Sequence, residues 1–133
     1  MRRATYIIAA AAISLGSIVS AKSEDFEFKS GGNCSSHEPW KPDKLTVKRE
    51  HDGTVRARIV FNSQCVFDEN FSPHVEFLEG VVKLQVERNR SEITPDCSCT
   101  NKITFILKRP VPPGTVVVFG YDSDEPHLRS VAP

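Results

Sequence analysis

The chain has 133 residues, of which 39% are hydrophobic, and its 17 basic and 17 acidic side chains give a formal net charge of zero. This balance disfavours bulk electrostatic binding to nucleic acid or to an anionic membrane, for which a strongly basic domain is expected. The length suits a single domain with one modest core.

The N-terminus has the pattern of a secretory signal peptide. Arg2 and Arg3 precede an apolar stretch at residues 7–19, and small residues follow where a signal peptidase would cut. No other stretch has the ~18 to 20 apolar residues that a membrane helix needs. We therefore expect residues 1–21 to be removed and residues 22–133 to form a secreted domain, extracellular or, in a bacterium, periplasmic. Because both arginines leave with the signal, the mature domain has a formal charge of −2.

The first strong strand signal is a hairpin. Segments 45–50 and 54–61 alternate between polar and apolar residues, and the Asp52-Gly53 pair between them is typical of a tight turn. The alternation places four basic residues on the face opposite the apolar row: Lys44, Lys48, Arg56 and Arg58. We interpret this patch as a docking site for an acidic protein partner. The alternative is that it is only the solvated outer face of a hairpin.

Further strands follow along the chain. Segments 75–79 and 81–88 flank Gly80, which indicates a turn or a bulge, and segment 102–108 alternates again. Segment 110–114 (PVPPG) interrupts the strands, and its Pro-Gly pair suits a type II turn. No stretch has helical periodicity. The sequence therefore predicts an all-β fold, a small antiparallel β-sandwich of six to seven strands with two disulfides.

Residues 115–121 (TVVVFGY) are apolar on both faces. In a two-layer sandwich only one row can face the core, so the other row needs cover from a loop, the tail or another chain. The charged, proline-containing tail offers little cover. We therefore expect Val117 and Phe119 to border a partner surface, with a homodimer through residues 115–121 as one form of it. If the Val117 row instead faces the core, Val118 takes its place.

Four cysteines, Cys34, Cys65, Cys97 and Cys99, lie in a chain that is routed to an oxidising compartment, which favours disulfides. A bridge between Cys97 and Cys99 is disfavoured, because Cα atoms two residues apart in an extended chain are about 6.5 to 7 Å apart, at the limit of disulfide geometry. Each therefore pairs with a distant partner. Antiparallel neighbours favour Cys65 with Cys99 and leave Cys34 for Cys97, although the exchanged pairing stays open.

Catalytic and metal sites are not expected. The histidines lack ligand spacing, and Met1, the one methionine, leaves with the signal, so a soft-metal site at Cys-x-Cys is a minor alternative and no cofactor is implied. A small secreted ribonuclease is another alternative. It would use His37-Glu38 or His74-Glu76 as acid and base, with Arg56 or Arg58 for phosphate. These residues supply the types but not a recognised pattern.

The last third of the chain resembles the MAX effectors of plant-pathogenic fungi, which are small secreted β-sandwiches. The resemblance consists of Cys97 or Cys99, then Pro112-Pro113-Gly114 and the apolar strand Val116 to Gly120, together with the signal peptide and the overall size. The Cys-x-Cys pair and the longer mature chain depart from that pattern. The resemblance implies a virulence protein that binds host proteins without catalysis.

We therefore expect a secreted, non-catalytic binding protein, a pathogen effector that docks on host proteins. Three N-glycosylation sequons, at Asn33, Asn70 and Asn89, favour a eukaryotic secretory pathway. A bacterial periplasmic inhibitor or immunity-type protein of the same architecture is the alternative. The residue pattern does not name the partner.

Overall fold

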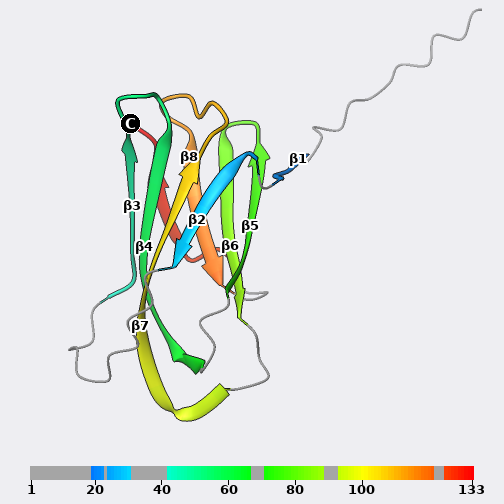
Figure 1. The fold of residues 1–133 in the computed structure, drawn as a ribbon. Helices are drawn as coiled ribbons and strands as arrows, with labels where there is room; N and C mark the ends of the chain where they lie inside the picture. The colour runs from blue at the N-terminus through cyan, green and yellow to red at the C-terminus, as the bar shows by residue number, and fades with distance from the viewer. Residues whose placement is uncertain (1–18, 23, 31–41, 67–70, 89–92, 122–124) are drawn as a thin grey trace, which may run out of the picture.

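The computed structural model describes residues 19–22, 24–30, 42–66, 71–88, 93–121 and 125–133 (Figure 1). For residues 19, 20, 64–66, 88 and 93–99 it describes the backbone alone. Every regular element in this part of the chain is a strand. No helix capable of crossing a membrane is found among these residues.

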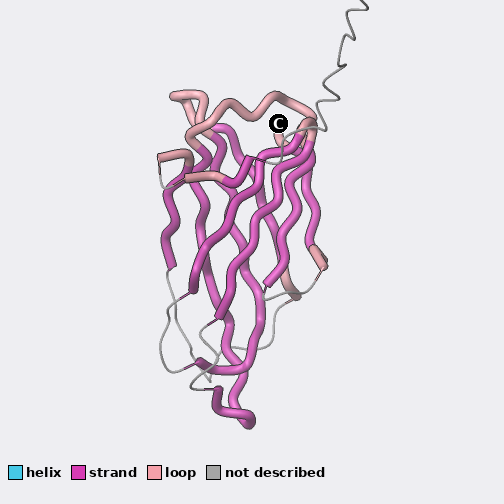
Figure 2. Tube along the Cα trace, turned by 90° about the vertical axis from the view of Figure 1, so that its right-hand side faces the viewer, coloured by secondary structure: helices cyan, strands magenta, loops and turns pink. Residues whose placement is uncertain are grey.

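The described strands form two sheets that face each other as the layers of a sandwich (Figures 1 and 2). The five-stranded sheet has the order β1-β5-β6-β8-β9, with the bounds Val19–Ser20 (β1), Phe71–Leu78 (β5), Val81–Arg88 (β6), Val116–Tyr121 (β8) and Leu128–Val131 (β9). The four-stranded sheet has the order β2-β7-β4-β3, with the bounds Phe26–Ser30 (β2), Ile93–Leu107 (β7), Val55–Val66 (β4) and Lys44–Arg49 (β3).

Neighbouring strands are antiparallel, except that β6 and β8 run parallel. The parallel pair arises because the chain leaves β6, crosses to the other sheet as β7 and returns as β8. The expected all-β sandwich is confirmed. The expectation of an antiparallel sandwich of six to seven strands holds only in part, because β1, β2 and β9 add to the predicted strands and β8 pairs with β6 in parallel.

Alternate residues of facing strands build the core, as their period of two predicts. The four-stranded sheet contributes the rows Val55, Ala57, Ile59 and Phe61 from β4 and Ile103, Phe105 and Leu107 from β7. The five-stranded sheet contributes Val82, Leu84 and Val86 from β6 and Val117 and Phe119 from β8. All of these side chains are at most 2% exposed.

The turn before β8 is a type II turn, as predicted. The Thr115 backbone N–H donates to the Pro112 carbonyl at 3.1 Å, and Gly114 has a φ of 88°. A type II turn requires a positive φ at its third residue, which glycine adopts without steric cost. This turn places Val111 and Thr115, both buried, on either side of the chain reversal.

Strand β8 corrects two expectations. Val117 and Phe119 are fully buried, so they belong to the core row and cannot border a partner surface; the half-exposed outer row is Val116 and Val118. The tail also returns to the fold, because β9 pairs with β8 and the Ala132 N–H donates to the Thr115 carbonyl at 2.8 Å. Much of the support for β8 therefore comes from the C-terminal segment of the same chain.

Candidate functional site

The outer face of the four-stranded sheet carries the basic residues that alternate with the core row. The register of β3 and β4 aligns Lys44 with Val60, Thr46 with Arg58, and Lys48 with Arg56. Because Ala57 and Ile59 between these positions are buried, the four predicted cations Lys44, Lys48, Arg56 and Arg58 point away from the core. The predicted patch is therefore assembled on one face.

Two further cations extend this face. Lys102 of β7 pairs in register with Val60, and Lys29 of β2 pairs with Thr104. Sequence reasoning missed both. The position of Lys102 beside the buried Ile103 was a signal that could have placed it outward, but the strand order that brings β2 and β7 beside β4 depends on non-local contacts.

Ion pairs neutralise only part of this surface. Arg56 Nε lies 3.1 Å from Glu50 Oε1, without hydrogen-bond geometry, and Lys108 Nζ lies 3.1 Å from Glu27 Oε1. The hydrogen bond from Lys108, and then its charge, lower the pKa of Glu27 below the ordinary value of 4.5. Among the described residues, no carboxylate forms an ion pair with the other five cations, Lys29, Lys44, Lys48, Arg58 and Lys102. We call these five exposed residues the basic face.

The basic face crosses the whole sheet. Each strand contributes at least one of its cations, and neighbouring strands are about 4.8 Å apart, so the face is about 14 Å wide across the four strands. A shallow hollow lies over β3, β4 and β7, with Thr46, Val60 and Thr104 between the cations. The local potential is therefore positive although the chain as a whole is neutral.

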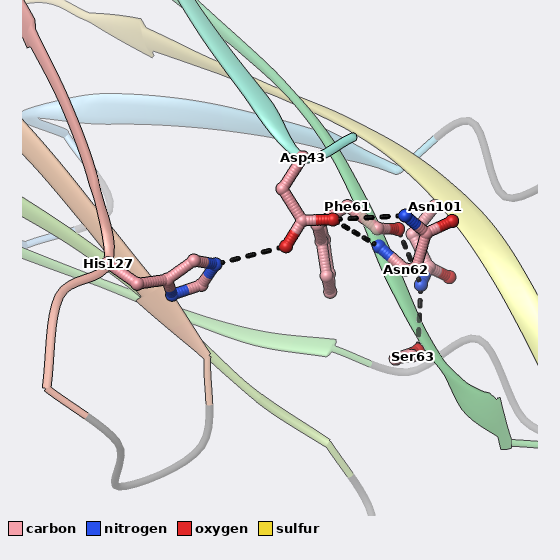
Figure 3. Close-up of polar contacts among 6 residues, drawn as sticks. All are labelled: Asp43, Phe61, Asn62, Ser63, Asn101 and His127. Carbon is pink, nitrogen blue, oxygen red and sulfur yellow. Dashed lines mark hydrogen bonds and ion pairs between the residues drawn. The ribbon is translucent and has the colours of Figure 1, made fainter. Parts of the chain in front are cut away.

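A second candidate is a polar network between the two sheets (Figure 3). Asp43, just before β3, accepts hydrogen bonds from the Asn62 backbone N–H at 2.9 Å and from Asn62 Nδ2 at 3.1 Å. Its other oxygen lies 3.2 Å from Nε2 of His127, just before β9. The ring of His127 contacts Phe119 and Tyr121 edge-on. These contacts hold two strands from different sheets together, which is a structural role.

The buried polar side chains next to this network have partners. Asn101 is 7% exposed, and its Nδ2 donates to Ser63 Oγ at 2.8 Å. Thr100 is 6% exposed, and its hydroxyl donates to Asn62 Oδ1 at 3.1 Å. Buried polar groups in stable folds are satisfied in this way. We therefore interpret the network as a structural element that closes one end of the sandwich and not as a substrate-binding site.

Among the described residues, the histidine and the arginines that a ribonuclease would need are not brought together. His74 lies on the outer face of the five-stranded sheet, with Nε2 3.7 Å from Glu87 Oε2, whereas Arg56 and Arg58 lie on the outer face of the other sheet. Packed sheets are about 10 Å apart, so both layers separate these groups. His37 and Glu38 lie outside the described residues. Within the described residues, no three His, Cys, Asp or Glu side chains cluster as a metal site.

The predicted disulfides fall outside the described side chains, because Cys34 is not described and Cys65, Cys97 and Cys99 are described by their backbone alone. The backbone nevertheless bears on their pairing. Ser63 pairs with Cys99 and Gln64 with Ser98, and the register then shifts between Gln64 and Val66, where Cys65 lies. The backbone therefore places Cys65 next to segment 97–99 of β7 without aligning it with one of the two cysteines there. The sequons at Asn33, Asn70 and Asn89 also lie outside the described residues.

Comparisons with models of protein families, with curated proteins and with solved structures find no match to this chain.

Proposed function

We propose that the protein is a secreted, non-catalytic binding domain that docks on an acidic surface of a partner protein through its basic face. The main observation that supports this proposal is that five exposed cations from four strands share one face without an ion pair to any described carboxylate. A surface that needs only to be solvated usually mixes both signs of charge.

The other outer face of the sandwich serves as an internal comparison. On the five-stranded sheet, acidic Glu76 and Glu87 are interspersed with basic Lys83 and Arg129. His74 also pairs with Glu87 there. The two faces therefore differ in charge pattern although the same chain builds both. This asymmetry supports a role for the basic face beyond solubility.

A protein partner fits this surface better than nucleic acid does. The total charge of the chain is zero, whereas a nucleic-acid-binding domain is typically basic overall. The ion pairs of Arg56 with Glu50 and of Lys108 with Glu27 also place carboxylates at the margin of the basic face. Mixed charges at a margin orient a protein partner, and the central cations accelerate its encounter.

Secretion is supported by the basic start, the apolar stretch and the small residues at 19–21. An effector role, with a host protein as partner, is supported by the resemblance of the last third to MAX effectors. A periplasmic inhibitor or immunity-type protein could dock through the same face. The intact mass of the protein secreted by its native host distinguishes the two, because N-glycans would exclude the bacterial alternative.

The docking face can be tested before the partner is known. Heptaglutamate serves as a defined acidic probe, and amide chemical shifts of the labelled protein report where it binds. We expect shifts on β2, β3, β4 and β7 that fade as salt rises, because exposed charges are screened within about 10 Å at 0.1 M salt. Equal shifts on both outer faces would contradict the proposal.

A further inference from the structure

The outer edge of β5 is occupied by an N-terminal segment of the same chain. Val19 and Ser20 pair with Phe77 and Glu76, and the Ala21 N–H donates to the Val75 carbonyl at 2.9 Å. The side chain of Ala21 is half-buried against the core. An added antiparallel strand therefore fits this edge both in its backbone and at the Ala21 side chain.

Antiparallel pairing determines which backbone groups of β5 face this edge. Residues of a strand alternate between facing one neighbour and facing the other. Because Val75 faces β1, the N–H and C=O groups of Val75 and Phe77 point to the outer edge. Those of His74 and Glu76 point to β6, their other neighbour. We call the outward groups of Val75 and Phe77 the β5 edge.

Pro73 limits the β5 edge on one side. It shares the alternation of Val75 and Phe77, so its missing N–H falls on the outer edge and leaves the pairing with β6 intact. Proline on an edge strand prevents another strand from adding there. The described β1 pairs only beyond Pro73, with Val75, Glu76 and Phe77. The β5 edge is therefore short and ends at Pro73.

The opposite side of the sandwich is closed by side chains. Arg49 Nε donates to the Pro133 carbonyl at 3.0 Å, and Arg49 Nη2 donates to the Val111 carbonyl at 2.6 Å. The Asp43–His127 contact joins the other ends of β3 and β9. At the β5 edge, the Arg109 guanidinium lies over the Phe77 ring, 4.9 Å from its centroid, but no described side chain hydrogen-bonds to the backbone of Val75 or Phe77. There the cover is the backbone of residues 19–21.

These covering residues are the last three of the segment that we expect signal peptidase to remove. Cleavage after Ala21 would take β1 away and leave the β5 edge without its partner. An unpaired strand edge is a template for another strand, and extended peptides bind proteins in this way.

We propose that the β5 edge is a strand-acceptor site. In the precursor, Val19–Ala21 fill it. In the processed protein, an extended segment of a partner polypeptide fills it, antiparallel to β5 and with a small apolar residue at the position of Ala21. This inference rests on the secretion in the proposed function but not on the basic face.

The site is tested on the chain of residues 22–133, which retains every described strand except β1 and every described core residue. We expect the Val75 and Phe77 amides to exchange with solvent at least about tenfold faster than those of His74 and Glu76, which stay paired with β6. A capped peptide of residues 15–21 (LGSIVSA) should slow the exchange of Val75 and Phe77. The absence of any effect at these two amides would overturn the proposal.

Two N-methylated peptides provide the matched comparison. A methyl group on the Ala21 nitrogen removes the donor to Val75, whereas one on the Ser20 nitrogen replaces an N–H that faces away from β5. We expect the first to weaken binding by at least about tenfold and the second by less than about threefold. Equal affinities of the two methylated peptides would contradict the proposed backbone pairing with β5.

A second experiment keeps the strand-filling segment covalently attached to the domain. Its result then depends neither on the affinity of a free peptide nor on the folding of the chain of residues 22–133. The chain of residues 15–133 is compared with its Ala21→Pro and Ser20→Pro variants, and only Ala21→Pro should release the Val75 and Phe77 amides. Failure of this comparison overturns the strand-acceptor site. N-terminal sequencing of the secreted protein separately tests processing, because a start other than Lys22 would contradict the expected cleavage.

Discussion

Asp43 and His127 join the two sheets of the sandwich, with Asp43 Oδ2 3.2 Å from His127 Nε2. Six residues later on both strands, Arg49 contacts the Pro133 carbonyl at 3.0 Å. Strands β3 and β9 therefore run in the same direction along one seam and are fastened at both ends, although no described backbone pairing links them. This seam closes the edge of the sheet whose outer face carries the basic face.

Replacing Asp43 tests what fastens this seam. The side chains of Asp43 and His127 are 25% and 35% exposed, so solvent weakens their contact and its contribution is at most about 1 kcal/mol. The larger role of Asp43 is to accept the Asn62 N–H. We expect Asp43→Ala to lower the free energy of unfolding by about 1 to 3 kcal/mol. Asp43→Asn, which keeps an acceptor oxygen, should cost less in urea unfolding, and an equal cost would contradict this assignment.

The two rows of β8 should respond differently to truncation. Phe119 is fully buried and packs against Phe61, with ring centroids 5.3 Å apart. Phe119→Ala should therefore cost about 3 to 5 kcal/mol in urea unfolding. Val118→Ala, in the half-exposed outer row, should cost about 1 kcal/mol or less. The reverse order of costs would mean that the strand faces the other way.

Strand β8 also shows which features of the fold could be predicted from the sequence. Alternation identified the core rows of β4 and β7, because only one of their faces is apolar. It could not orient residues 115–121, where both rows are apolar and the side that packs inward is decided by contacts with the other sheet.

The missed strands have the same cause. Segment 128–131 (LRSV) is short and carries little strand signal, and it becomes a strand by pairing with β8. Lys29 joined the basic face only because β2 lies beside β7. The hairpin cations, by contrast, were found from local alternation alone. The candidate site was thus predictable within one hairpin and not across the sheet.

Asp52 gives a prediction for pH dependence. Its Oδ1 accepts hydrogen bonds from the Thr54 hydroxyl at 2.6 Å and the Thr54 N–H at 2.9 Å, and these bonds lower the pKa of Asp52 below its ordinary value of 3.8. A carboxyl with a lowered folded-state pKa adds stability above its unfolded pKa, and this stability is lost as the pH falls through the folded value. Thr54→Val removes the hydroxyl bond, so the pKa of Asp52 should rise toward 3.8.

A carbon-13 titration of the Asp52 carboxyl measures this change directly. The stability difference between the parent chain and Thr54→Val should also shrink as the pH falls through the acid range. A pKa that is unchanged in the variant would show that the hydroxyl bond is not the cause of the shift.

The cysteines should form two disulfides, with Cys97 and Cys99 each bonded to one of the distant partners Cys34 and Cys65. A direct Cys97–Cys99 bridge is disfavoured, because Cα atoms two residues apart in an extended strand are about 6.5 to 7 Å apart, at the limit of disulfide geometry. Thiol titration of the denatured, unreduced protein should find no reactive thiol. Because β4 pairs with β7 as far as Gln64 and Ser98, peptide mapping should recover Cys65 linked to Cys97 or to Cys99, and a Cys97–Cys99 link would contradict this assignment.

The most direct test of the docking face compares two charge reversals of equal size in binding to a partner recovered from the native surroundings. Arg58→Glu with Lys102→Glu reverses two cations of the basic face, and Lys83→Glu with Arg129→Glu reverses two on the opposite sheet. The measurement is the dissociation constant by surface plasmon resonance, with melting temperatures as the control for folding. We predict that the first pair weakens binding by at least about tenfold and the second by less than about threefold, at similar melting temperatures. Unchanged binding by the first pair, or equal losses from both pairs, would contradict docking through the basic face.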